Sequence, residues 1–192
     1  MMLTRLRRGL LWVSRAKYCR GFGIQSPWAY RFVRYVINEH WPYYAYEDLR
    51  HAFPRLSLRD RRLGELYLRL ANHLQAAEVE LIGPVSEAAR AYLHAGCHAM
   101  RLREGRGTPH TQFAFAVIAR RSDLQQETMA MIDRAQDDAI LVVEGIHRNA
   151  AVRKSWSRIL QDSRVRVSFD LYYCGILCFD RKKYKQHYKI NF

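Results

Sequence analysis

The sequence predicts an α/β protein with a mainly parallel sheet, an antiparallel finish and a helical segment in front of it. The most informative stretch is 79–93, where the short strand-like run Val79–Ile82 leads through a turn at Gly83 into a helix. Strand-like and helix-like segments then alternate as far as residue 161, which is typical of parallel strands joined by helical crossovers. The end of the chain differs, because β-rich segments joined by short links fill 164–191.

The first 75 residues are predicted to be helical and to form a cap on the sheet rather than an independent domain. Apolar residues at helical spacing indicate a basic amphipathic helix over 2–17. Ser26 suits an N-cap and Pro27 suits the first turn, so a second helix begins there and runs to about Glu39. A third, longer helix is predicted over Leu58–Leu74.

The α/β domain is predicted to span 76–192. Its expected strands lie near 79–82, 99–102, 113–118 and 139–144, and its expected helices near 86–95, 123–135 and 149–161. Three further β-rich segments follow, at 164–170, 173–179 and 186–191. The last two are predicted to form a hairpin through the turn 180–183, which gives the sheet an antiparallel edge.

A chain of 192 residues is long enough for one domain with a sizeable core. No apolar run approaches the roughly 18–20 residues that cross a membrane, and no secretory signal pattern is present, so a cytoplasmic protein is expected. The four cysteines form no CxxC pair. Cys174 and Cys178 lie in an apolar β-like run and are expected in the core, which argues against a zinc site or a disulfide framework.

The net charge of +14 is concentrated at the two ends of the chain. Residues 1–75 hold 14 Lys and Arg against 5 Asp and Glu, 76–160 hold 11 against 10, and 161–192 hold 7 against 3. Basic ends suit an anionic partner such as nucleic acid, a membrane surface or an acidic protein. A solvated basic surface explains them as well, and we favour it because no RNA-binding signature is present.

Three stretches carry a resemblance to a known family. Residues 20–28 are similar to a G-x-H-S-P-F segment, 81–93 to an E-I-G-T-S-x-G…Y-L cofactor loop, and 169–192 to a closing hairpin. Together they resemble the class I S-adenosylmethionine-dependent methyltransferases, and most closely a bacterial subgroup that looks like the O-methyltransferases. The similarity spans most of the chain, and its two ends are the more specific.

The resemblance implies a Rossmann-like methyltransferase sheet with S-adenosylmethionine as the cofactor. It places the cofactor at the turn formed by Gly83 and Ser86, with Glu104 at the end of the second strand on the ribose hydroxyls. An active member would methylate a small acceptor, chiefly by positioning the two reactants. His147, which follows the strand that ends at Glu144, is the candidate base.

Several positions depart from the family pattern, and these departures predict weak or absent catalysis. Leu81 stands at the family's glutamate, Glu87 at its second glycine and Gln25 at its histidine. Glu144 stands where the family has paired aspartates, and one carboxylate supplies too few ligands for a divalent metal, so no metal is expected. The stretch 105–112 leaves no room for the family's third strand and its helix, so a reduced sheet is predicted.

Two other function classes stay open. The chain is alternatively a non-catalytic scaffold that uses its basic, aromatic N-terminal region to bind a protein or an anionic partner. It is also a candidate for binding nucleic acid or a membrane surface through its ends, including Arg181–Lys183. His147 and His110 are equally explained as loop histidines, and Arg120 and Arg121 either bind an anion or lie on the surface.

Overall fold

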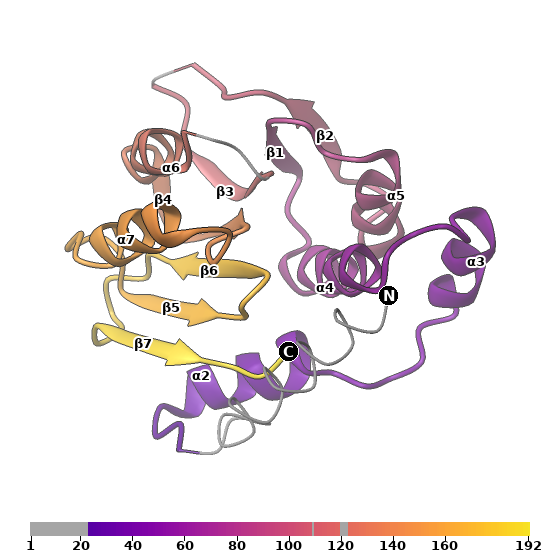
Figure 1. Cartoon of the computed structure of the whole chain (residues 1–192), viewed down its shortest axis with the longest axis horizontal. Coiled ribbons are helices and arrows are strands. Elements are labelled where there is room, and N and C mark those ends of the chain that lie inside the picture. Colours follow the sequence, from indigo (N-terminus) through magenta and orange to yellow (C-terminus); the bar gives the residue numbers. More distant parts are fainter. Residues whose placement is uncertain (1–22, 109, 120–122) are drawn as a thin grey trace.

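The computed structural model describes residues 23–108, 110–119 and 123–192, and it has three layers, with helices on both faces of one sheet (Figure 1). The strands are β1 Glu78–Ile82, β2 Arg101–Glu104, β3 Phe113–Ile118, β4 Ala135–Glu144, β5 Val167–Asp170, β6 Cys174–Cys178 and β7 Gln186–Lys189. The helices are α2 Pro27–Phe32, its π-helical continuation η2 Val33–Ile37, α3 Ala45–Ala52, α4 Leu58–Leu74, α5 Glu87–Gly96, α6 Leu124–Ile132 and α7 Ala150–Ile159. The predicted helix over 2–17 lies outside the described residues.

The sheet has the order β2-β1-β3-β4-β6-β5-β7. Strands β1 to β4 are parallel, as predicted, while β6 runs antiparallel to both of its neighbours, β4 and β5. The predicted hairpin between the last two strands is wrong, because β7 pairs with β5 and runs parallel to it. The antiparallel strand is therefore an interior strand, and the antiparallel hairpin at this end of the chain is formed by β5 and β6.

The burial of the two strands explains why β7 does not pair with β6. All five residues of β6 are buried, as expected for a strand that is paired on both sides and covered on both faces. Strand β7 alternates between half-buried and exposed residues, which is typical of an edge strand. Hydrogen bonds to β4 and β5 occupy both edges of β6, so no edge remains for β7.

The two faces of the sheet bury separate apolar cores. Leu81 of β1 and Val142 of β4 pack with residues of α2, η2, α4 and α5. Leu141 and Val143 face the other way and pack with α6 and α7, which Figure 1 shows apart from α4 and α5. The alternation follows from the two-residue period of a strand. Cys174 and Cys178 are buried in the first of these cores, as predicted.

Side-chain caps fix the starts of four helices. Ser26, Ser57, Ser86 and Asn149 each accept a hydrogen bond from a backbone amide three residues later, at 2.8–3.3 Å. The predicted cap at Ser26 is therefore confirmed. The helix that it begins ends with η2 at Ile37, where buried Arg69 donates to the carbonyl oxygens of Val36 and Ile37.

Several predicted boundaries differ from the observed ones. The second strand lies at 101–104 rather than 99–102, and β4 begins at Ala135, four residues before the predicted start. The helices predicted over 123–135 and 149–161 end earlier, at Ile132 and Ile159. Helix α3 was not predicted, since its aromatic and charged residues follow an aromatic connector that shows little helical periodicity.

The link between β2 and β3 is short, as predicted, and a buried ionic network holds it. Glu80 of β1 accepts hydrogen bonds from both terminal nitrogens of Arg134, at 2.6 and 3.0 Å, from Arg103, and from the amide of Gly107 at 3.2 Å. Arg134 also donates through Nε to the carbonyl of Thr111 at 2.7 Å. Gly107 and Thr111 are thus tied to this network, in the link that was predicted to be too short for a further strand and helix, and β2 is an edge strand of the sheet.

Candidate functional site

The strands β1, β2, β3, β4 and β5 share one direction, so their carboxyl ends all lie along one side of the sheet, which we call its carboxyl edge. In open α/β sheets, ligands bind outside this edge. The residues that follow the strands here include Gly83 after β1, Glu104 at the end of β2, and His147 after β4. The structure therefore brings Gly83, Glu104 and His147 to the same end of the sheet.

Gly83 makes the turn after β1 with a φ of +91°, a backbone conformation that favours glycine. Its carbonyl oxygen accepts a hydrogen bond from the amide of Val85 at 2.9 Å, which closes the turn. The Oγ of Ser86 accepts a hydrogen bond from the amide of Ala89 at 3.2 Å and so begins α5. Glu87 is an exposed residue in the first turn of that helix, where a negative charge is favourable.

Arg90 links the Gly83 turn to the end of β2. Its guanidinium donates to the carbonyl oxygen of Val85 through Nε, at 3.3 Å, and through Nη2, at 3.1 Å. Its third nitrogen, Nη1, lies 2.7 Å from Oε1 of Glu104. Glu104 does end β2, as predicted, but its carboxylate is already paired with a cation. The roles of Gly83, Ser86 and Glu104 toward a cofactor stay predictions.

His147 forms a dyad with Asp170, the last residue of β5. The distance from Nε2 of His147 to Oδ2 of Asp170 is 2.7 Å. The ring of Tyr172 stacks on the imidazole with a centroid distance of 5.1 Å and an angle of 12° between the planes. An ionised carboxylate only accepts hydrogen bonds, so Asp170 fixes the proton on Nε2 and leaves Nδ1 as the basic nitrogen.

The backbone around this dyad is unusual. Tyr172 has a φ of +71°, which is uncommon for a residue with a side chain, and its amide donates to Oδ1 of Asp170 at 2.9 Å. The amide of Gly145 donates to the carbonyl oxygen of Tyr173 at 2.7 Å, joining the loop after β4 to the link between β5 and β6. These two contacts hold the Tyr172 ring and the His147 loop against each other.

Glu144, at the end of β4, lies among residues of α4. The Tyr67 hydroxyl donates to Oε1 of Glu144 at 2.6 Å, and Nη2 of Arg59 lies 3.5 Å from Oε2. Burial, reinforced by the Glu144 carboxylate, raises the pKa of the Tyr67 phenol well above its usual value, so the phenol stays a hydrogen-bond donor. Burial raises the pKa of the Cys174 thiol in the same way, so this buried thiol is not a nucleophile.

The other residues predicted from the sequence are dispersed. Gln25 is exposed before α2, and Ser26 is the cap of that helix. His110 is exposed in the link between β2 and β3. Arg120 and Arg121 lie outside the described residues.

Sequence reasoning missed the partners of the predicted residues. Asp170, Tyr172, Tyr67 and Arg90 were given no role. The available signal for Asp170 was a single carboxylate that ends a strand. Its partner could not be identified, because the pairing of β5 with β6 was not predicted.

The described residues contain no cluster of three or more His, Cys, Asp or Glu side chains that could hold a metal ion. Among the helices in the described part of the chain, none is long and apolar enough to cross a membrane.

No protein-family model and no curated protein matches the sequence. Solved structures do match. The Podospora anserina methyltransferase PaMTH1, solved with bound S-adenosylhomocysteine, has a TM-score of 0.55 at 13% identity, over 81% of this chain and 97% of its own. The O-methyltransferase TomG from Streptomyces achromogenes, solved with S-adenosylmethionine, has a TM-score of 0.48 at 14% identity, over 77% of this chain and 93% of its own. The O-methyltransferase from Bacillus cereus has a TM-score of 0.47 at 12% identity, over 75% of this chain and 94% of its own.

The similarity to PaMTH1 shows that this chain shares the Rossmann-like α/β fold of that methyltransferase. The α/β fold predicted from the sequence is thereby confirmed, apart from the pairing of its last strand.

Proposed function

We propose that this protein is a methyltransferase-like enzyme with weak activity, which holds S-adenosylmethionine at the Gly83 turn and methylates a small hydroxyl-bearing acceptor. The observation that carries the proposal is the dyad of His147 and Asp170, with a 2.7 Å contact, at the sheet edge where the Gly83 turn lies. A base held by a carboxylate is what removal of a proton from a hydroxyl requires.

The cofactor-side residues fit an adenosyl group in part. Gly83 makes the sharp turn that follows the first strand of such a site, and Glu104 ends the neighbouring strand. S-adenosylmethionine would supply the methyl group when bound. Arg90 competes for Glu104, because the ribose hydroxyls and the guanidinium need the same carboxylate. This competition supports the expectation of weak binding.

Residues of the chain itself would remove the proton of the acceptor hydroxyl. Asp170 accepts the Nε2 hydrogen of His147, so Nδ1 takes the proton from the acceptor hydroxyl. Stacking with Tyr172 restricts rotation of the imidazole and so keeps Nδ1 in one orientation. The resulting imidazolium is stabilised by the Asp170 carboxylate, in the way that a carboxylate supports the histidine of a hydrolase triad.

The proposal is tested by titrating the protein with S-adenosylmethionine in a calorimeter. Binding is expected for the wild type and is expected to be lost in Gly83→Arg. Gly23→Arg is the matched control, since Gly23 also has a positive φ, +82°, and no heavy atom lies within 4 Å of an added Cβ. Arg90→Met is expected to bind more tightly by up to about fivefold, because it releases Glu104 from an exposed ion pair. Absence of heat at millimolar cofactor in the wild type and in Arg90→Met would refute the proposal.

A second candidate function is binding of a protein or anionic partner through the N-terminal region. The supporting observation is a set of exposed aromatic side chains: Tyr35 is 62% exposed, Trp41 73% and Tyr44 97%. Arg34 is half-buried and lines one shallow pocket together with Tyr35 and Trp41, and Arg31 is exposed one helical turn before Tyr35. Aromatic and arginine side chains are the types that contribute most to interfaces. Binding of a polyanion such as heparin that weakens with salt, and further weakens in Trp41→Ala, would support this candidate.

A further inference from the structure

Helix α7 carries positively charged side chains on its exposed side. The segment 145–161, which contains α7, holds 4 Lys and Arg residues and no Asp or Glu. Arg153, Lys154 and Arg158 are all exposed. Lys154 and Arg158 are four residues apart, and Arg153 adjoins Lys154, so the three share one side of the helix. We name these three residues, together with the exposed Ser157 beside Arg158, the α7 strip.

No ion pair neutralises the α7 strip. Within the described part of the chain, neither Arg153, Lys154 nor Arg158 lies in ion-pair contact with a carboxylate. Figure 1 shows α6 beside α7, and α6 contains a single carboxylate, Glu127. This carboxylate pairs with Arg106 at 3.5 Å. The strip therefore presents three positive charges to solvent.

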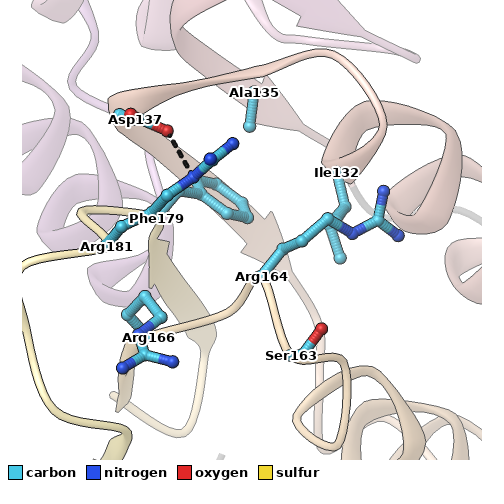
Figure 2. Close-up of a pocket in the computed structure, with 8 residues that line it drawn as sticks. All are labelled: Ile132, Ala135, Asp137, Ser163, Arg164, Arg166, Phe179 and Arg181. Atoms are coloured by element: carbon cyan, nitrogen blue, oxygen red, sulfur yellow. Dashed lines mark ion pairs between the residues drawn. The ribbon is translucent and has the colours of Figure 1, made fainter.

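The carboxylates beyond the C-terminal end of α7 are matched by other cations. Figure 2 shows three arginines that line a pocket there: Arg164, Arg166 and Arg181. Arg164 lies 2.6 Å from Asp133 and 2.7 Å from Asp162. Arg181 lies 2.9 Å from Asp137, and the dashed line marks this pair. Three arginines thus face three aspartates, and no carboxylate of this group is left to balance the α7 strip.

A fourth cation lies just past the end of α7. Nζ of exposed Lys185 donates to the carbonyl oxygens of Gln161 and Asp162, at 2.9 Å each. A cation at the C-terminal end of a helix is favoured by the helix dipole. Its position extends the positive surface from the α7 strip into the turn after the helix.

The chemistry of the α7 strip favours a nucleic acid over other anionic partners. None of the residues of α7, all of which the structure describes, exposes a large apolar side chain. A helix that lies on a membrane inserts such side chains, and protein interfaces are centred on them. Arginine, lysine and serine side chains, by contrast, are common donors to the phosphate oxygens of nucleic acids.

The length of α7 also suits a phosphate backbone. Its 10 residues extend over about 15 Å, which at about 3.4 Å of axis for each phosphate of one strand corresponds to about four phosphates. We propose that the α7 strip binds the phosphodiester backbone of a nucleic acid, without reading the base sequence. This inference does not depend on the proposed methylation.

The test measures the fluorescence anisotropy of labelled DNA and RNA duplexes of about 20 base pairs as the full chain is added, at salt concentrations between about 50 and 200 mM. Both duplexes are expected to bind, because the phosphodiester backbone is common to them. The logarithm of the binding constant should fall linearly with the logarithm of the salt concentration, by about 0.9 for each cation that contacts a phosphate of DNA.

The decisive variant combines Arg153→Gln, Lys154→Gln and Arg158→Gln. Glutamine has nearly the helix propensity of arginine and lysine, so α7 is expected to form, which circular dichroism checks. Removing three phosphate contacts should reduce the salt slope by about 2–3 and weaken binding roughly tenfold or more.

The matched control combines Arg31→Gln, Arg55→Gln and Arg101→Gln, which remove the same charge from exposed positions on α2, before α4 and on β2. These positions are outside α7, and salt at 0.1 M screens exposed charges beyond about 10 Å, so affinity should change by less than about twofold. Gly83→Arg should also leave binding unchanged, which keeps this result separate from the methyltransferase proposal.

Two outcomes would overturn the inference: no binding of either duplex, or an equal loss of affinity in the two triple variants. Tighter binding to phosphatidylserine vesicles or to polyglutamate than to the duplexes would also overturn it, because the partner would then be a membrane or an acidic protein. If the triple variant in α7 does not fold, Lys154→Gln alone should still reduce the salt slope by about 1, and an unchanged slope would contradict the inference.

Discussion

The ionic network around Glu80 makes a quantitative prediction about stability. Glu80 is 1% exposed and Arg134 is 6% exposed, and they form two hydrogen bonds at 2.6 and 3.0 Å. Glu80→Met removes the carboxylate and leaves the Arg134 guanidinium buried with two neutral acceptors, the Thr111 carbonyl and the Met131 thioether. Breaking a buried pair from one side leaves an uncompensated charge, so we expect a loss of about 3–5 kcal/mol in the free energy of unfolding.

The double variant Glu80→Met with Arg134→Met gives the decisive comparison. It removes both charges and fills the space with apolar groups, so its loss should be smaller than that of Glu80→Met alone. The measurement is urea unfolding followed by tryptophan fluorescence and circular dichroism, with the four proteins compared as a double-mutant cycle. We expect a coupling of about 2 kcal/mol or more. Additive losses, or a loss below about 1 kcal/mol for Glu80→Met, would show that the network does not hold the link between β2 and β3.

Three further predictions concern packing, pH and catalysis. Gly175→Ala should lower stability by about 1–3 kcal/mol, because an added Cβ would lie 2.3 Å from the Trp156 ring, and Trp156→Leu in the same chain should restore part of the loss in a urea titration. Burial lowers the pKa of His187 below its usual 6.5, so the unfolded chain binds a proton more readily than the folded chain does. Stability should therefore fall as the pH drops below 6.5, and His187→Gln should flatten this fall in thermal melts at several pH values. Asp170→Asn should reduce methylation and change its pH profile while leaving cofactor affinity within about twofold, since Asp170 acts through His147; an unchanged profile would exclude the dyad as the base.

Local features of the fold could be predicted because their causes are local. The strand-like run before Gly83 and the polar cap at Ser26 are short-range signals, and each lies where the sequence predicted it. The parallel strands β1, β3 and β4 follow from apolar segments that alternate with helices. The absence of a further strand and helix between β2 and β3 could be predicted because too few residues separate the two strands.

Features that depend on pairing between distant segments could not be predicted. Nothing in the residues of β7 shows that its partner is β5 rather than β6, because both alternatives bury one face of a short strand. The partner of Glu80 is Arg134, 54 residues away, and the pair exists only because the link after β2 is short. The dyad of His147 and Asp170 was missed for the same reason, since it depends on the order β4-β6-β5.

The departures from the family pattern at the Gly83 turn are energetically smaller than the sequence alone indicates. Glu104 and Arg90 are both partly exposed, and exposed ion pairs contribute about 0–1 kcal/mol, so displacing Arg90 reduces cofactor affinity by up to about fivefold. Glu87 is also exposed in the first turn of α5, where the helix dipole accounts for it. By contrast, the contacts of the dyad are partly buried, and Tyr172 beside them has a strained backbone with a positive φ. A loop with a purely connecting role does not need such strain. The side of the site that would handle the proton is therefore the more strongly built, and this favours retained catalysis over a scaffold that has lost it.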